Sequence, residues 1–247
     1  MIYLNYSEDG CFEMQNEKMS DELTVIAHIS SPFSEKFGIP RQSGLVEDIL
    51  SRIVFVPPFG TFEAFRGIEG YSHLWLIWKF SKVQNRNFSP TVRPPKLGGN
   101  KRVGVFATRS PFRPNNLALS CVKLEKVETD EHGSVCLVVS GADLMDGTPI
   151  YDIKPYLPYT DSHPEALPGF SKGAGECELE VIFADELLSS LPPELQSGAV
   201  SVLKQDPRPG YQSEPERMYY IMLSEYEIAF TVDGKTLTVK SVEKKGR

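Results

Sequence analysis

Five short segments combine charged or amide side chains with proline and glycine, as ligand-binding loops often do. They are residues 40–44 (PRQSG), 91–100 (TVRPPKLGGN), 107–116 (ATRSPFRPNN), 143–149 (DLMDGTP) and 152–158 (DIKPYLP). The first three offer guanidinium, ammonium and amide groups, and the fourth places two carboxylates three residues apart before a glycine turn. Binding groups concentrate on loops that a rigid sheet holds in place. Each loop alone is also explained by turn chemistry and solvated charge, but the five together predict a binding or catalytic site.

Several common sites are excluded by the motifs that the sequence lacks. It contains neither G-x-G-x-x-G nor the P-loop pattern, and neither H-E-x-x-H nor G-x-S-x-G. The four histidines are widely spaced, so no metal site is expected, and His73 beside Leu74 and Trp75 is expected to be a core residue. The four cysteines form no C-x-x-C pair and are expected to be buried thiols.

The 247 residues carry a net charge of −7, but the charge is unevenly distributed. Residues 70–124 contain ten Lys and Arg and no Asp or Glu, which leaves 16 basic and 33 acidic residues elsewhere. Phe88 and Phe112 lie within this acid-free window. Cations neutralise phosphates and exposed aromatic rings stack on bases, so the window predicts an RNA-binding surface. The alternative is an ordinary solvated surface.

Short runs rich in Val, Ile, Phe, Trp and Leu predict strands at residues 23–29, 52–56, 73–80, 103–108, 117–127 and 135–140. A short helix is expected at 61–67, capped by Thr61 and ended by Gly67. After a Pro- and Gly-rich linker we expect a strand at 177–183, helices at 184–191 and 194–204, and a hairpin of 218–231 with 235–242 around Asp233-Gly234.

These elements predict a mainly β protein of four parts. An N-terminal extension occupies residues 1–20, and a β-barrel domain of mixed or antiparallel strands occupies 21–157. A linker at 158–176 leads to a small α+β domain at 177–247. No signal peptide or membrane-spanning run is visible in the sequence, so we expect a cytoplasmic protein without a membrane partner.

The same segments resemble the TrmO/TsaA (YaeB-like) family. The matching motifs are FGIPRQ at 37–42, RGIEGYSHLW at 66–75, GVFATRSPFR at 104–113, the loops at 91–100, 143–149 and 152–158, and QDPRP at 205–209. They run in the family's order from about residue 25 to 245. The chain departs from the family at 116–118, where Asn-Leu-Ala replaces the common Pro-Ile-Gly, and at Phe80-Ser81, where Phe-His is frequent.

The resemblance implies a β-barrel methyltransferase with a small C-terminal domain, usually a homodimer. Its implied reaction is S-adenosylmethionine-dependent methylation of N6-threonylcarbamoyladenosine at tRNA position 37, beside the anticodon. The implied cofactor residues are Pro40, Arg41, Gln42, Phe80, Ser81, Arg109, Leu119, Asp143, Leu144, Met145 and Asp146. Arg109 can pair with the cofactor carboxylate, and Asp143 or Asp146 can accept hydrogen bonds from its ammonium or ribose diol. Leu119, Leu144 and Met145 can pack its adenine.

Methylation of a carbamoylated nitrogen also needs a group that accepts the N–H proton. We expect Asp152 or Asp206 to act here, with Lys154, Tyr156 and Arg208 orienting the modified base; the alternative for Asp152 is a structural turn carboxylate. Within the acid-free window, the residues expected to contact the tRNA anticodon stem-loop are Arg93, Lys96, Lys101, Arg102 and Arg113.

Two other classes of protein remain open at this point. One is an RNA-binding barrel without a cofactor, in which the loops only hold RNA. The other is a methyltransferase or hydrolase that acts on a small molecule through the same loops. Calorimetry with S-adenosylmethionine separates the methyltransferase from the first alternative, and analysis of tRNA nucleosides separates both from the second.

Overall fold

The computed structural model describes residues 22–83, 88–94, 97, 100–131, 133–172, 178–208 and 214–246. The extension predicted at residues 1–20 lies outside the described residues, as do Lys96, Cys177 and Pro209.

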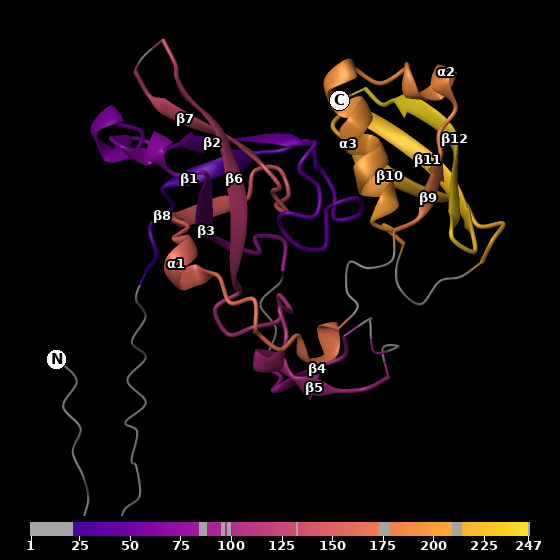
Figure 1. Ribbon diagram of the computed structural model, residues 1–247, viewed down its shortest axis with the longest axis horizontal. Coiled ribbons are helices and arrows are strands. Elements are labelled where there is room, and N and C mark those ends of the chain that lie inside the picture. Colours follow the sequence, from indigo (N-terminus) through magenta and orange to yellow (C-terminus); the bar gives the residue numbers. More distant parts are fainter. Residues whose placement is uncertain are drawn as a thin grey trace, which may run out of the picture.

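Six antiparallel strands close into a barrel (Figure 1), which confirms the predicted barrel and the mainly β fold class. The barrel strands are β1 (Ala27–Ser30), β2 (Leu50–Phe55), β3 (His73–Lys79), β6 (Leu117–Thr129), β7 (Val135–Ser140) and β8 (Pro149–Pro155). Around the barrel they follow the order β1-β2-β7-β6-β3-β8. Alternate residues of β3 face inward, since Leu74, Leu76 and Trp78 are buried. Successive side chains of a strand point to opposite faces, so this alternation sorts core residues from those that can reach a ligand.

A second, four-stranded sheet forms the C-terminal part of the chain, with the order β10-β11-β12-β9. Its elements are β9 (Glu180–Ile182), α2 (Asp185–Leu188), α3 (Pro193–Lys204), β10 (Tyr219–Leu223), β11 (Tyr226–Asp233) and β12 (Thr236–Lys244). Pro193 occupies the first turn of α3, where its missing N–H costs no hydrogen bond. The predicted hairpin of β11 and β12 is present, but its two turn residues are Gly234 and Lys235, one position later than expected, because Asp233 still pairs with Thr236. Gly234 has φ 56°.

The remaining elements are short. They are η1 (Phe62–Phe65), η2 (Ile68–Gly70), β4 (Thr91–Val92), β5 (Val103–Gly104), η4 (Val105–Ala107), α1 (Pro158–Asp161) and η5 (Gly169–Ser171). Strands β4 and β5 pair as a small separate hairpin. No described helix is long and apolar enough to cross a membrane. Within the described ranges, no cluster of His, Cys, Asp and Glu is arranged to hold a metal ion.

Four details of the expected elements were wrong. Residues 103–108 form only two strand residues before the turn η4. Residues 152–155 continue β8 instead of forming a loop, because this strand must close the barrel between β1 and β3. Ser224, at φ 56°, splits 218–231 into β10 and β11. Thr61 makes no side-chain cap for η1, although Gly67 does adopt the left-handed conformation at φ 90°.

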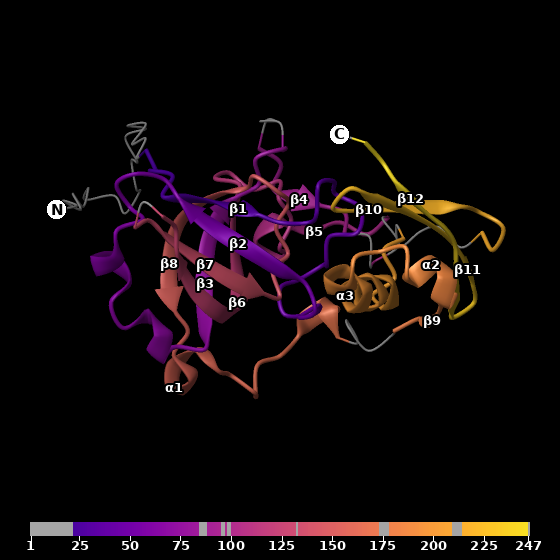
Figure 2. The same ribbon diagram turned by 90° about the horizontal axis from the view of Figure 1, so that it is seen from above.

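The segment between β1 and β2, residues 31–49, joins the barrel to the C-terminal sheet, and we call it the bridging segment. Figures 1 and 2 both show it reaching from the barrel toward α3 and β10. Its Phe33, Val46 and Ile49 are buried in the hydrophobic core of the C-terminal sheet, separate from the barrel core. The Ser224 amide donates to the Pro32 carbonyl at 2.5 Å. The C-terminal core is therefore completed by residues that precede it by about 150 positions in the sequence.

We expect Ile49→Ala to lower the free energy of unfolding by about 2–4 kcal/mol, because it empties a buried site in that core. A Cβ added at Gly198 would lie 2.3 Å from Ile49 Cγ1, so Gly198→Ala alone is destabilising as well. In the double variant the added methyl occupies part of the vacated space, and the combined loss is expected to be smaller than the sum of the two. Denaturant unfolding of the four proteins measures this coupling; purely additive losses would contradict the packing described.

Candidate functional site at the end of the barrel

Asp143 lies just after β7 and anchors a chain of buried polar contacts. The Ser120 hydroxyl donates to Asp143 Oδ1 at 2.5 Å and accepts from Trp78 Nε1 at 2.9 Å. The Trp78 ring contacts the Phe80 ring edge-on at a centroid distance of 4.6 Å. The ends of β3, β6 and β7 thus hold a carboxylate beside two aromatic rings. Such an arrangement can bind a ligand that has both a polar and an aromatic part.

Burial raises the pKa of the Asp143 carboxyl above its ordinary value, because the charged form loses hydration. Hydrogen bonds from Ser120 and from the backbone amides of Asp143 and Ser43, and the positive charge of Arg109, act in the opposite direction. The site therefore presents a carboxylate whose charge is only partly compensated by the protein. A cationic ligand placed against it would stabilise the ionised form.

The bridging segment supplies the second wall of the site through Gln42, Ser43 and Gly44. Arg109 Nη1 donates to the side-chain oxygen of Gln42. The amide of Cys121 donates to Ser43 Oγ at 3.1 Å, and the amide of Gly44 donates to the Gly141 carbonyl at 2.9 Å. These contacts fasten the segment to β6 and to the loop that carries Asp143. Two of the five loops singled out in the sequence, 40–44 and 107–116, therefore meet the 143–149 loop.

Arg41 points toward the C-terminal sheet instead. Its Nη2 donates to the carbonyl oxygens of Asp206, at 2.8 Å, and of Arg208, at 3.2 Å. Arg208 in turn donates two hydrogen bonds to the Asp206 carboxylate, from Nε at 2.8 Å and from Nη2 at 3.0 Å. Asp206 has a left-handed backbone with φ 49°. The loop that follows α3 is thus tightly folded and attached to the bridging segment.

The other residues implied for the cofactor occupy different environments. Pro40 is buried and Ser81 is exposed. Leu144 is fully buried and packs with residues of the barrel core. Asp146 Oδ1 accepts the amide of Ser31 at 3.0 Å, which joins the 143–149 loop to the start of the bridging segment. The contact expected between the Leu144 side chain and an adenine ring stays a prediction.

Leu119, 54% exposed, lies on the outer surface of β6, with its neighbour Ser120 on the inner side. Strand pairing places Ile77 of β3 opposite Leu119 of β6 on one side and Asp152 of β8 on the other. Met145, next to Leu144, is half-buried.

Asp152, Lys154 and Tyr156 lie along β8 and just beyond it. Asp152 accepts the Ile153 amide at 2.9 Å and pairs with Lys154 Nζ at 3.0 Å. The Tyr156 ring lies 5.7 Å from the Trp75 ring, measured between centroids. Trp75 Nε1 donates to Asp161 at 2.9 Å, and this bond and the Leu157 amide lower the pKa of Asp161.

The structure divides the expected catalytic residues into two sets, one on β8 and one in the loop after α3. In the part of the chain that the structure describes, no hydrogen bond or ion pair joins Asp152, Lys154 and Tyr156 to Asp206 and Arg208. Asp152 pairs with Lys154 and Asp206 pairs with Arg208, and these two pairs belong to separate parts of the structure.

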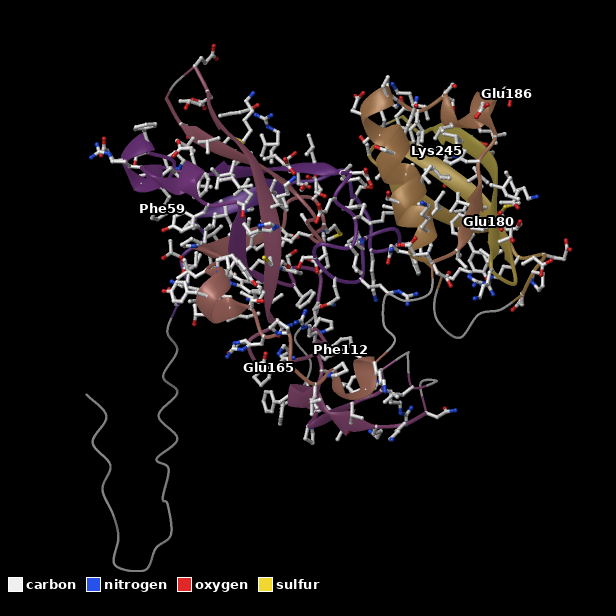
Figure 3. The ribbon with its side chains drawn as sticks, viewed as in Figure 1. Phe59, Phe112, Glu165, Glu180, Glu186 and Lys245 are labelled. Atoms are coloured by element: carbon white, nitrogen blue, oxygen red, sulfur yellow. The ribbon has the colours of Figure 1, made fainter. Side chains whose placement is uncertain are left out.

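Three cations of the acid-free window lie exposed at the β4–β5 hairpin. Arg93 follows β4 and Lys101 and Arg102 precede β5, so strand pairing brings these three cations to one end of the hairpin. Arg102 Nε donates to Thr91 Oγ1 at 2.9 Å. Figure 3 places Phe112 between the barrel and this hairpin. Lys96, also expected to contact RNA, lies outside the described residues.

Phe106 belongs to the same surface and is 71% exposed. The Arg113 guanidinium lies 5.9 Å from its ring centroid, and Arg113 Nη1 donates to the Thr108 carbonyl at 2.7 Å. Sequence reasoning missed Phe106 because the run at 103–108 was read as a buried strand. It also missed Trp78, Ser43 and Ser120, whose roles come from contacts between distant segments. The indole N–H of Trp78, which needs a partner when buried, was the one available signal.

Comparisons with protein families match the chain along most of its length. The model of the tRNA-methyltransferase O N-terminal domain matches residues 28–162, and that of the TrmO C-terminal domain matches residues 176–245.

Individual relatives agree with these matches. The chain is 40% identical over 232 residues to the tRNA (adenine(37)-N6)-methyltransferase of Escherichia coli K12, covering 91% of this chain and 98% of that protein. It is 38% identical over 217 residues to the putative S-adenosylmethionine-dependent methyltransferase RcsF of Pseudomonas aeruginosa PAO1, covering 85% and 92%. A crystal structure of TrmO from P. aeruginosa superposes with a TM-score of 0.75 at 32% identity, covering 93% of this chain and all of that one.

Proposed function

Because the chain belongs to the tRNA-methyltransferase O family, we propose that it methylates N6 of adenosine 37 in tRNA, using S-adenosylmethionine as the methyl donor. The substrate base in this proposal is N6-threonylcarbamoyladenosine, beside the anticodon. The observation that carries the proposal is the meeting of four distant segments around Asp143: the bridging segment, the Arg109 loop, the end of β3 and the end of β6.

The residues around Asp143 fit the charges of S-adenosylmethionine. The cofactor carries a carboxylate, an ammonium and a sulfonium, together with a ribose diol and an adenine ring. Arg109 uses the neutral amide of Gln42 as its partner and forms no ion pair with a described residue, so its charge is available to a carboxylate. Asp143 supplies the opposite charge, which suits the ammonium or the diol. Pro40, Gln42, Phe80, Ser81, Leu119 and Met145 complete the proposed site.

When bound, S-adenosylmethionine supplies an electrophilic methyl group. The protein must orient the modified base and accept the proton of its N6–H, because the nitrogen lone pair is delocalised into the ring and the carbamoyl group. In the proposed division of roles, Asp152 or Asp206 holds that proton, and Lys154, Tyr156 and Arg208 orient the base and its carboxylate. Lys154 already neighbours Asp152, and Arg208 already neighbours Asp206.

The proposed RNA surface is tested by its salt dependence. The variant Arg93→Glu with Lys101→Glu is expected to weaken tRNA binding by at least about tenfold near 0.1 M salt and to flatten the plot of log affinity against log salt. Both cations are exposed and lie in the acid-free window. Filter binding or anisotropy between about 50 and 200 mM salt measures both quantities.

The matched control for this variant reverses Arg66 and Lys126, which already pair with Glu63 and Glu128 and lie outside the window. It is expected to leave the slope unchanged. Equal slopes in the wild type and in the Arg93 and Lys101 variant would contradict the assignment of this surface to RNA.

The function itself is tested by incubating the protein with S-adenosylmethionine and unmodified or threonylcarbamoylated tRNA, followed by mass spectrometry of the nucleosides. A 14-Da increase on N6-threonylcarbamoyladenosine alone supports the proposal. No heat of binding with S-adenosylmethionine would instead favour a cofactor-free RNA-binding barrel. Cofactor binding without methylation of either tRNA would favour a small-molecule methyltransferase.

We extend the proposal to a cytoplasmic homodimer. A tRNA substrate is met in the cytoplasm, and the outer surface of the barrel exposes apolar side chains such as Leu50 and Val54. Sedimentation equilibrium at several concentrations tests the dimer.

A further inference from the structure

The loop that follows α3 depends on one residue of the bridging segment for its attachment. Gln205, Asp206 and Arg208 belong to the C-terminal part of the chain, whereas Arg41 lies between β1 and β2. One guanidinium nitrogen of Arg41 reaches the carbonyl oxygens of both Asp206 (2.8 Å) and Arg208 (3.2 Å). Because the acceptors are backbone atoms, Arg41 fixes the backbone of this loop and not the position of a single side chain.

The loop is shaped to receive this guanidinium. The left-handed backbone of Asp206 reverses the chain at the end of α3. The amide of Arg208 donates to Asp206 Oδ1 at 3.3 Å, and the Arg208 guanidinium binds both carboxylate oxygens. This pair is partly buried, with 13% of the Arg208 side chain exposed. The compact turn leaves the Asp206 and Arg208 carbonyls within reach of one donor group.

The same stretch of the bridging segment continues into the cofactor side of the site. The Gln42 side chain donates to the Arg41 carbonyl and accepts from Arg109. Ser43, the next residue, is bonded to the amide of Cys121 in β6. A continuous series of contacts therefore runs from the loop after α3, through Arg41 and Gln42, to Arg109 beside Asp143.

Apolar packing holds the segment firmly on the C-terminal side. Phe33, Val46 and Ile49 are buried in the C-terminal core, and Gly38, at φ 91°, lies so close to β10 that an added Cβ would be 3.2 Å from Ile221 Cβ. The ends of the segment are thus fixed independently of Arg41. Loss of the guanidinium should release the loop after α3 without detaching the segment.

We propose that the Arg41 side chain is a positioning group that fastens the Asp206–Arg208 turn to the cofactor loop, so that methyl transfer requires its guanidinium although this group is directed at the loop carbonyls. This inference rests on the proposed function and changes the role that the family resemblance implies for Arg41. Asp206 and Arg208 are the groups through which it acts.

The test compares Arg41→Ala and Arg41→Lys with the wild type. Calorimetry gives the Kd of S-adenosylmethionine, and single-turnover methylation at saturating cofactor and tRNA gives the rate. For Arg41→Ala we expect a rate at least about tenfold lower with the cofactor Kd changed by less than about threefold. Arg41→Lys, which keeps the positive charge but replaces the planar guanidinium by an ammonium, should be intermediate. The matched control is Arg66→Ala. Arg66 is an exposed arginine at the C-terminal end of η1, where it pairs with Glu63.

Hydrogen exchange provides a readout that does not depend on activity. The amides of Asp206 and Arg208, bonded to the Leu203 carbonyl and to Asp206 Oδ1, should exchange faster in Arg41→Ala and not in Arg66→Ala. A cofactor Kd raised about tenfold with an unchanged saturated rate would make Arg41 a cofactor ligand and overturn the proposal. Unchanged rate and exchange would overturn it as well.

Two further outcomes are distinguishable. If Arg41→Ala does not fold, Arg41→Lys decides the question by the same comparison of rate, Kd and exchange. If the wild type methylates no tRNA, the proposed function fails, while faster exchange in the variant would still support the attachment of the loop.

Discussion

Asp143→Asn is expected to raise the Kd of S-adenosylmethionine by about 10- to 100-fold, the effect of losing charge-assisted contacts from a buried site. The asparagine keeps an oxygen that can accept the Ser120 hydroxyl, so the contact with Trp78 through Ser120 survives. The change removes the negative charge that the proposed site offers to an ammonium or diol. Isothermal calorimetry of both proteins measures the Kd directly.

The same substitution is expected to alter stability in a defined direction. Burial raises the pKa of Asp143 in the folded protein, so the unfolded chain ionises first. Stability of the cofactor-free protein therefore falls as the pH rises from the ordinary aspartate range, about 3.9, through the raised folded value, and the loss is complete above it. Asp143→Asn should lack this component, which unfolding measured across the acidic range reveals.

Asp185→Asn, in the first turn of α2, is the matched control for both measurements. It should bind the cofactor as the wild type does. A Kd for Asp143→Asn equal to that of Asp185→Asn would remove Asp143 from the cofactor site.

Elements whose conformation is set by their own residues could be predicted from the sequence, whereas elements set by pairing with distant strands could not. Strands β2, β3 and β7 were predicted because each is a run of apolar or alternating residues. The hairpin of β11 and β12 was predicted because Asp-Gly is a strong signal for a two-residue turn. Strand β8 was not predicted, since its two prolines and its charged residues resemble a loop. Its strand conformation is imposed by pairing with β1 and β3.

The composition of the site was predicted better than its geometry. Loops containing Gln42, Arg109 and Asp143 were selected for their residue types, and the structure brings them together. The division between inner and outer faces at the end of β6 was not visible, because it depends on which side of the barrel each residue occupies. The attachment of Arg41 to the Asp206 carbonyl joins residues 165 positions apart, a distance at which one sequence carries no pairing signal.

The choice between Asp152 and Asp206 as proton acceptor is the second large effect. Both oxygens of Asp206 receive hydrogen bonds from Arg208, in a pair where only 29% of the Asp206 side chain is exposed. Asp206 is thus used to shape its loop, and taking up a proton would break that pair. Asp152 is 46% exposed, and its partner is the flexible side chain of Lys154. The geometry favours Asp152 for the chemistry and Asp206 for structure.

We therefore expect Asp152→Asn to lower the single-turnover rate by about 100-fold or more, equivalent to about 2.7 kcal/mol of transition-state stabilisation. Asp206→Asn should reduce the rate less, and it should speed exchange of the Arg208 amide, because the bidentate pair that orders the loop is lost.

The cofactor Kd should stay near the wild-type value in both variants, since neither carboxylate contacts the Asp143 cluster among the described residues. A larger loss of rate in Asp206→Asn than in Asp152→Asn would assign the proton acceptor to the C-terminal loop. Wild-type rates in both would exclude both carboxylates and leave the proton to solvent or to the tRNA itself. Single-turnover rates at saturating cofactor, measured for the wild type and both variants, distinguish these results.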